Sequence, residues 1–266
     1  MDRKDPLFLS DVDGTLLKTR ESVPPAALDA IREWMKAGGR FALSTGRCLR
    51  SARKLVEEIP VNAPCILCGG ALVYDFQEDR ALAVKPLGEA VLQKLRDILA
   101  AYPGVSVTVT TSRSVYNLRK NDRLRNRGVE EDAGAPLISL EEIPEPVVKA
   151  LFTEDDPQVL EALRDRFFSG GEETFSFASR HFCELTARGV HKGSAAAFLR
   201  RFCAAGRVYA AGDAMSDVHM ARSCDFFFAP ASAPEEVRRR ADRLFPPPRE
   251  GGIAKAIQYA LAQETG

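Results

Sequence analysis

The chain has 266 residues, of which 45% are hydrophobic and 28% are charged, and its 37 basic residues balance 37 acidic ones. This length can bury a substantial core and can hold one large domain or two smaller ones. A formal net charge of zero gives no global electrostatic argument for nucleic acid or an anionic membrane as a partner. The N-terminal residues lead into a strand-like run too short for a signal peptide, and no apolar run approaches membrane-spanning length. We therefore expect a cytoplasmic protein with no nucleic-acid or membrane partner.

The first part of the chain alternates predicted strands and helices. Apolar runs over 7–9, 40–43 and 64–67 predict buried strands, and apolar residues at helical spacing predict helices over 25–36 and 50–56. This alternation indicates right-handed crossovers and a parallel sheet. In such sheets, ligand chemistry gathers at the carboxyl ends of the strands.

Two carboxylates follow the first predicted strand. Asp11 and Asp13 are spaced i, i+2, which puts both on the same side of an extended segment, and Gly14 lets the chain turn beneath them. Carboxylates that close together repel, so they need a shared proton or a cation. Mg²⁺ suits oxygen ligands of this kind. Taken by itself, this pair of acids is better explained as a polar turn that closes a strand.

The middle of the chain changes to the pattern of an α+β layer. We predict paired short strands over 69–75 and 81–84, then helices over 87–101 and 156–169 and strands over 105–110, 146–152 and 174–178. From Arg188 the alternation resumes, with helices from 192, from 233 and over 253–262 and strands over 207–213 and 226–229. The prediction is a doubly wound parallel-sheet core formed by 1–84 and 188–266, with a domain inserted over 85–187.

The predicted inserted domain contains a strongly basic segment over 113–127, which has six basic residues against the single acid Asp122. We interpret it as a solvated loop whose charge the acids at 130–132 offset. The alternative is a basic rim that attracts an anionic substrate. His181 and Glu184, near the return to the core, are interpreted as a strand pair rather than as ligand contacts.

Polar groups at predicted strand ends and helix starts supply what phosphoryl transfer requires. The reaction needs a carboxylate nucleophile, a metal, a hydroxyl and an ammonium for the phosphate oxygens, and an acid for the leaving group. Each group, taken alone, also has a purely structural explanation, such as a turn at Thr45 or a helix cap at Asp217. Their joint occurrence is much less probable by chance than any one of them. The groups are Asp11, Asp13, Thr45, Lys192, Asp213 and Asp217.

Four segments, 11–17, 44–47, 192–193 and 212–217, resemble the four motifs of haloacid dehalogenase-like (HAD) hydrolases. The resemblance is strongest to the Cof-type subfamily, subclass IIB, and it covers essentially the whole chain in order. It implies a Rossmann-like HAD core with an α+β cap inserted between the second and third motifs. The gap of about one hundred residues between the predicted sheet halves fits such a cap.

The resemblance also implies a Mg²⁺-dependent phosphatase that acts on a small phosphorylated metabolite, for example a sugar phosphate. Asp11 would be the nucleophile that forms an aspartyl-phosphate. Asp13 would protonate the leaving oxygen and then activate water, while its main-chain carbonyl binds Mg²⁺. Asp213 would be the second carboxylate on the metal.

The remaining implied roles concern the phosphate and the surroundings of the metal. Thr45, Gly46 and Lys192 would bind the phosphate oxygens. Asp217 would support the metal shell or orient Lys192, and Ser216 would support it too. Serine stands at 216 where the family usually has asparagine, so an outer-shell bond would be longer or bridged by water.

Two alternatives share the same motifs. A phosphomutase would form the same aspartyl-phosphate but return the phosphoryl group to a sugar, and a non-enzymatic ligand-binding protein would keep only the scaffold. The presence of Asp11, Asp13, Lys192 and Asp213 argues against the second alternative. A further departure is Gly69, where the family often has an asparagine whose amide would contact the ligand. The Cys65–Cys68 spacing lacks a second pair and is interpreted as reduced thiols in the core.

Overall fold

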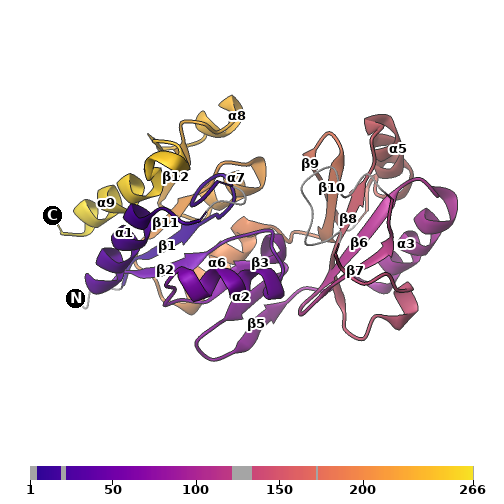
Figure 1. The fold of residues 1–266 in the computed structure, drawn as a ribbon, viewed down its shortest axis with the longest axis horizontal. Helices are drawn as coiled ribbons and strands as arrows, with labels where there is room; N and C mark the ends of the chain where they lie inside the picture. The colour runs from indigo at the N-terminus through magenta and orange to yellow at the C-terminus, as the bar shows by residue number, and fades with distance from the viewer. Residues whose placement is uncertain (1–4, 19–21, 122–133, 172, 266) are drawn as a thin grey trace. The chain divides into compact units, whose positions relative to one another are not determined.

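The structure is a computed structural model that describes residues 5–18, 22–121, 134–171 and 173–265. The chain forms two compact units (Figure 1). The first comprises Met1–Arg47, Ala52–Leu82 and His191–Gly266, and the second comprises Cys48–Ser51 and Ala83–Val190. The chain therefore enters the second unit briefly over Cys48–Ser51, enters it again after Leu82, and returns to the first unit at His191.

Five parallel strands form the main sheet of the first unit, in the order β13-β12-β11-β1-β2. Their bounds are β1 Leu7–Ser10, β2 Arg40–Leu43, β11 Val208–Ala211, β12 Phe226–Pro230 and β13 Arg243–Phe245. The helices of this α/β part are α1 Pro25–Lys36, α2 Leu49–Glu58, α6 Lys192–Phe202, α7 Met215–Ala221, α8 Glu235–Arg238 and α9 Gly252–Thr265. β1 has a strand on each side, so its carboxyl end opens between two neighbouring strand ends.

Strand β1 is buried throughout, as expected for a parallel strand covered on both faces. On one face, the ring of Phe8 meets the edge of Trp34 from α1 and lies near the rings of Phe41 and Tyr209 from the two adjacent strands. This aromatic cluster fixes β1 between the flanking layers. The strand that leads into Asp11 is thus held firmly in place.

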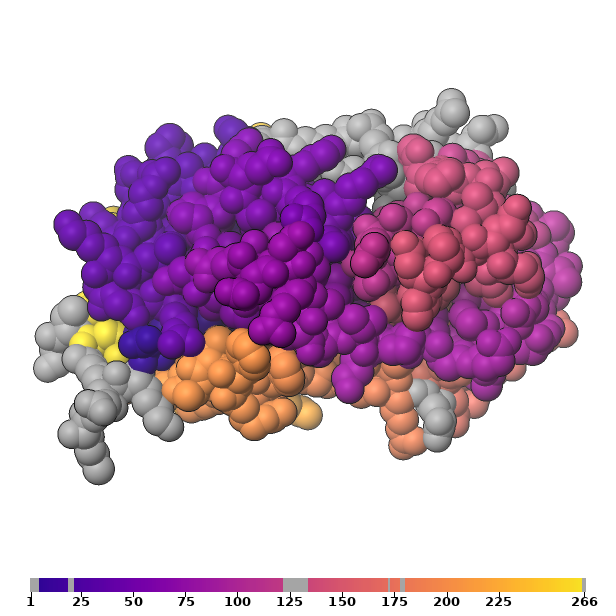
Figure 2. All heavy atoms as spheres, turned by 90° about the horizontal axis from the view of Figure 1, so that it is seen from below, coloured from indigo at the N-terminus to yellow at the C-terminus, as the bar shows by residue number. Residues whose placement is uncertain are grey.

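A smaller sheet in the order β3-β4-β5 adjoins the end of β2. Its strands are Cys65–Leu67, Leu72–Asp75 and Arg80–Val84, and the short 3-10 turn η1 over Cys68–Gly70 joins the first two. A parallel bridge between Ser44 and Ile66 ties it to the main sheet. In the space-filling view, the orange atoms around α6 lie beside the violet atoms of the α2–β5 region (Figure 2).

The second unit contains an antiparallel sheet in the order β7-β6-β8-β10-β9. Its elements are α3 Glu89–Ala101, β6 Ser106–Thr111, β7 Val115–Arg119, the 3-10 turn η3 Leu140–Glu142, β8 Val147–Thr153, α5 Pro157–Phe167, β9 Glu173–Ser179 and β10 Phe182–Ala187. Alternate residues of the strands join apolar residues of the helices in one core, which includes Leu95, Val107, Phe152 and Leu163. The parallel sheet and this separate α+β layer confirm the predicted fold class.

Three strands were not predicted. β7 lies within 113–127, so the loop interpretation is wrong over 115–119, while 122–127 lies outside the described residues. The charge density of this stretch hid its alternation. Arg119 donates to the carbonyls of Leu99 and Tyr102 at the end of α3, so its charge serves the structure of the second unit.

The other two missed strands are β10 and β13. β13 is a three-residue strand at the edge of the sheet, and it follows the helix that was predicted from 233. The predicted domain boundaries lay at 84/85 and 187/188, whereas the units divide at 82/83 and 190/191. Within the described ranges, no helix has the length and apolar character needed to cross a membrane.

Candidate active site

The candidate site lies where β11, β1 and β2 end side by side. Ser10 is in register with Ala211 on one side and with Leu43 on the other. The ladder continues one step further, because the Asp11 N–H donates to the Ala211 carbonyl at 2.9 Å. This register brings Asp11 and Asp213 to the same edge of the sheet, as the parallel topology predicts.

Lys192 places its ammonium between two carboxylates. Its Nζ donates to Asp11 Oδ1 at 2.7 Å and to Asp217 Oδ1 at 2.5 Å. The residue is 4% exposed, and Asp11 is 6% exposed. A buried charge is tolerated only when it is paired and hydrogen-bonded, so Lys192 and its two partners form one interdependent group.

Asp217 has both carboxylate oxygens occupied. While Oδ1 accepts from Lys192, Oδ2 accepts from the backbone N–H groups of Asp213 at 3.1 Å and of Ala214 at 2.9 Å. The side chain therefore fixes the turn that carries Asp213 and orients Lys192 at the same time. Of the two roles that the sequence left open for Asp217, this geometry favours the orientation of Lys192.

Asp213 is held from the loop after β1. Thr15 Oγ1 donates to Asp213 Oδ1 at 2.9 Å. A Cβ added to Gly14 would lie 2.3 Å from Asp213 Oδ2, and Gly14 has a φ of +90°, so only glycine fits there. Thr15 was not predicted to take part, although it lies inside the motif 11–17.

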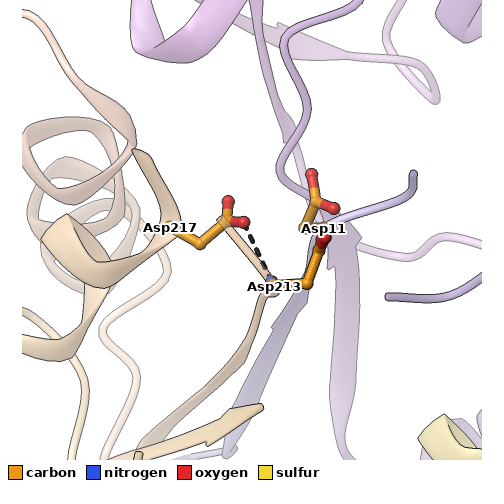
Figure 3. Close-up of side chains that lie close together, drawn as sticks. All are labelled: Asp11, Asp213 and Asp217. Atoms are coloured by element: carbon orange, nitrogen blue, oxygen red, sulfur yellow. Dashed lines mark hydrogen bonds between the residues drawn. The ribbon is translucent and has the colours of Figure 1, made fainter. Parts of the chain in front are cut away.

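The three carboxylates form a cluster suited to a cation. One oxygen from each of Asp11, Asp213 and Asp217 lies within 4.8 Å of the others. Asp11 and Asp213 lie side by side, and Asp217 faces them from α7 (Figure 3). Three carboxylates and the ammonium of Lys192 leave a formal charge of −2 (−3 + 1), which a divalent cation would cancel. Oxygen donors in this number suit Mg²⁺.

The ionisation of the cluster reflects this excess of negative charge. Burial, and then repulsion from Asp217, raise the pKa of Asp11 well above its ordinary value, and the same two causes raise the pKa of Asp213. Burial alone would lower the pKa of Lys192, but attraction to Asp11 and Asp217 outweighs it and raises the pKa. Lys192 therefore stays charged, and a proton or a cation is needed between the acids.

The carboxylate of Asp13 is bound by a different cation, Arg47. Nε of Arg47 donates to Asp13 Oδ2 at 2.8 Å and Nη2 donates to Oδ1 at 2.7 Å. The Arg47 N–H donates to the hydroxyl of Thr45 at 3.1 Å. Arg47 was not predicted to take part, and its place at the end of the motif 44–47 was the signal available.

The remaining predicted residues lie on the same loops. Thr45 follows β2, is 1% exposed, and is anchored by its N–H to the Ile66 carbonyl at 2.8 Å and by its carbonyl to the Gly69 N–H at 3.1 Å. Gly46 follows it directly, and Ser216 is exposed on α7. Phosphate binding by Thr45 and Gly46, and the contact of the Asp13 carbonyl with Mg²⁺, stay predictions.

Several other polar residues have structural roles. The Nδ1 of His191 accepts from the Ser194 N–H at 3.1 Å and so caps α6. Glu184 pairs with Lys149 at 2.9 Å on neighbouring strands of the second unit. Burial raises the pKa of Cys65 to about 12, which fits the predicted inert core thiol.

The chain resembles known proteins both in sequence and in structure. A family model described as haloacid dehalogenase-like hydrolase matches residues 8–257. The chain is 24% identical over 280 residues to the 5-amino-6-(5-phospho-D-ribitylamino)uracil phosphatase YitU of Bacillus subtilis, and this match covers 97% of the chain and 98% of that protein.

Solved structures resemble the chain over nearly its whole length. A haloacid dehalogenase-like hydrolase from Bacteroides thetaiotaomicron matches with a TM-score of 0.85 at 20% identity, covering 97% of this chain and 100% of that one. The HAD subclass IIB sugar phosphatase BT4131 matches with a TM-score of 0.82 at 18% identity, covering 96% and 98%. These two structures share the fold of this chain.

Proposed function

This chain belongs to the haloacid dehalogenase-like hydrolases, and we propose that it is a Mg²⁺-dependent phosphatase that hydrolyses a small phosphorylated metabolite through an aspartyl-phosphate on Asp11. The observation that carries the proposal is the buried triad of Asp11, Lys192 and Asp217 beside Asp213. It combines a carboxylate that can attack, a fixed ammonium, and a negative charge that requires a divalent cation.

The first step transfers the phosphoryl group to the protein. The Asp11 carboxylate attacks phosphorus, the bond from phosphorus to the leaving oxygen breaks, and that oxygen takes a proton from Asp13. Lys192 lies against Asp11 and offsets negative charge between the nucleophile and the phosphate. Thr45 and Gly46 provide a hydroxyl and a backbone N–H for the phosphate oxygens.

The second step releases the phosphate. Asp13 accepts a proton from a water molecule as the water attacks phosphorus, and the bond from phosphorus to Asp11 breaks. Inorganic phosphate leaves and the Asp11 carboxylate is restored. Asp11, Asp213 and the main-chain carbonyl of Asp13 are the proposed ligands of Mg²⁺, which supplies, when bound, positive charge next to the transferred group.

The substrate that we propose is a phosphate ester of a sugar or a sugar-alcohol chain. The support is the relative from Bacillus subtilis, whose named substrate carries its phosphate on a ribityl chain. The second unit is proposed as the cap that would exclude water during the first step and admit it for the second. The protein itself is proposed to be cytoplasmic.

The test is phosphate release from a panel of sugar, sugar-alcohol and cofactor phosphates, with and without Mg²⁺, by the wild type and Asp11→Asn. We expect release that requires Mg²⁺ and falls to background in Asp11→Asn, because an amide cannot act as the nucleophile. Asp29→Asn, at an exposed site on α1, is the matched control and should keep full activity. Hydrolysis that persists in purified Asp11→Asn would rule out this nucleophile, and phosphoryl transfer to a sugar without net phosphate release would identify a phosphomutase.

A further inference from the structure

We propose that Arg47 is the positioning residue of Asp13, and that it holds the Asp13 carboxylate in the orientation in which proton exchange with the leaving oxygen and with water takes place. This inference rests on the proposed phosphatase activity. Its basis is the two-point contact between guanidinium and carboxylate at the end of β2.

The contact fixes the plane of the Asp13 carboxylate. The two N–H···O bonds, of 2.8 Å and 2.7 Å, go to different oxygens, so the planar fork of Arg47 prevents rotation of the carboxylate. Each carboxylate oxygen has two acceptor sites, and the fork uses one on each. No other described residue bonds the Asp13 carboxylate, so Asp13 can exchange a proton at its other acceptor sites while Arg47 holds it.

Arg47 is itself anchored by its main chain. Its N–H donates to Thr45 Oγ1 at 3.1 Å, and its carbonyl accepts from the Cys68 N–H at 3.0 Å. The loop after β2 is therefore tied to η1 on one side and to the predicted phosphate-binding hydroxyl on the other. Through Arg47, the same loop that presents Thr45 also sets the direction of Asp13.

A contribution to the stability of the fold is a weak explanation for this ion pair. The side chains of Arg47 and Asp13 are 26% and 34% exposed. Partly exposed ion pairs contribute about 0–1 kcal/mol to folding, because solvent screens the charges and two side chains lose rotamer freedom. Asp13 lies on a short turn closed by the Gly14 N–H and the Leu17 carbonyl, at 2.8 Å. A side chain on a turn needs an external partner to hold one rotamer, and Arg47 supplies it.

The experiment compares Arg47→Lys, Arg47→Ala, Asp13→Asn and the double variant Arg47→Ala/Asp13→Asn on the best alkyl phosphate of the panel. We expect Asp13→Asn to lower kcat by about 10²–10⁴-fold, the usual contribution of acid–base catalysis. Arg47→Ala should lower kcat by at least about 10-fold with KM nearly unchanged, and the double variant should be no slower than Asp13→Asn. Lysine keeps the charge but cannot form the fork, so Arg47→Lys should recover only part of the loss.

Two further measurements separate positioning from phosphate binding. Inhibition by inorganic phosphate should be unchanged in Arg47→Ala if Arg47 acts through Asp13. The loss should also shrink for an aryl phosphate, whose leaving oxygen departs without a proton. Weaker phosphate inhibition and a higher KM, with losses that multiply in the double variant, would overturn the proposal and make Arg47 a phosphate ligand.

The controls keep the outcomes distinct. Arg32→Ala removes an exposed arginine that also pairs with an aspartate, at 3.1 Å on α1, and should leave kcat unchanged. Unchanged kcat in Arg47→Ala would reduce the Asp13 pair to a surface ion pair and overturn the proposal. A wild type without phosphatase activity would contradict the proposed function instead. Arg47→Lys serves as the test variant if Arg47→Ala does not fold.

Discussion

At the scale of single residues, Lys192 is the side chain on which the site depends. It bonds Asp11 and Asp217, and Asp217 in turn bonds the backbone of the turn that carries Asp213. One ammonium thereby joins the carboxylates of Asp11 and Asp217 and, through Asp217, the turn that carries Asp213. Because it is buried with them, its removal leaves uncompensated negative charge rather than one missing contact.

We expect Lys192→Ala to lower the free energy of unfolding by about 3–5 kcal/mol in the absence of metal, the usual cost of breaking a buried pair. Chemical denaturation followed by circular dichroism measures this change. Lys36→Ala removes an exposed lysine from the last turn of α1 and should change the free energy by less than about 0.5 kcal/mol. Equal effects of the two variants would contradict the central role of Lys192.

The raised pKa of Asp11 makes metal binding depend on pH. Burial and repulsion from Asp217 raise this pKa, so Asp11 takes up a proton at a higher pH than an exposed aspartate does. Protonation removes the charge that attracts Mg²⁺. We expect the affinity for Mg²⁺, measured by calorimetry, to fall as the pH decreases, beginning well above the pKa of about 3.9 of a free aspartate. An affinity that stays constant until that value would refute the prediction.

At the scale of elements, the turn η1 packs closely against the start of α6. Cys68, Gly69 and Gly70 have φ values of 52°, 67° and 107°. A Cβ added to Gly70 would lie 2.4 Å from the carbonyl oxygen of His191 and 3.0 Å from the backbone nitrogen of Lys192. The close approach of two backbones therefore determines where α6 begins, and with it where the Lys192 side chain starts.

The variant Gly70→Ala tests this contact, and Gly38→Ala is its matched control. Both glycines have positive φ, but an added Cβ at Gly38 meets nothing within 4 Å. We expect Gly38→Ala to cost about 1–2 kcal/mol, the strain of a left-handed residue, and to leave activity intact. Gly70→Ala should cost more and reduce kcat as well, because relief of the clash moves Lys192. Full activity in Gly70→Ala would show that the contact does not position Lys192.

At the scale of the whole molecule, the described members of the candidate site all belong to the first unit. They come from the ends of β1, β2 and β11 and from the starts of α6 and α7. The single tryptophan of the sequence, Trp34, also belongs to this unit and is fully buried. Its fluorescence therefore reports on the unit that holds the site, whereas circular dichroism reports on both.

We expect Mg²⁺ to raise the unfolding midpoint seen by Trp34 fluorescence. A ligand that binds only the folded state at about 100 times its Kd adds about 2.7 kcal/mol of stability. Asp213→Asn should remove most of this effect, whereas Asp29→Asn should retain it. A midpoint that Mg²⁺ leaves unchanged in the wild type would contradict the proposed metal site.

Local pattern in the sequence determined most of the fold and the identity of the candidate residues. Hydrophobic periodicity depends on neighbours along the chain, so it predicted β1, β2, β11 and the helices between them, and motif spacing selected Asp11 and Lys192. Hydrophobic periodicity failed where many charged residues or the shortness of a strand obscured the alternation, as in β7 and β13.

Only the tertiary structure decided which side chains meet. The contact between Lys192 and Asp11 joins residues 181 positions apart, and the pairing of Arg47 with Asp13 depends on how the loop after β2 packs. The bonds of Asp217 to Lys192 and to two backbone N–H groups likewise depend on how α6 and α7 pack. Such contacts depend on register and burial, which arise when separate elements pack together.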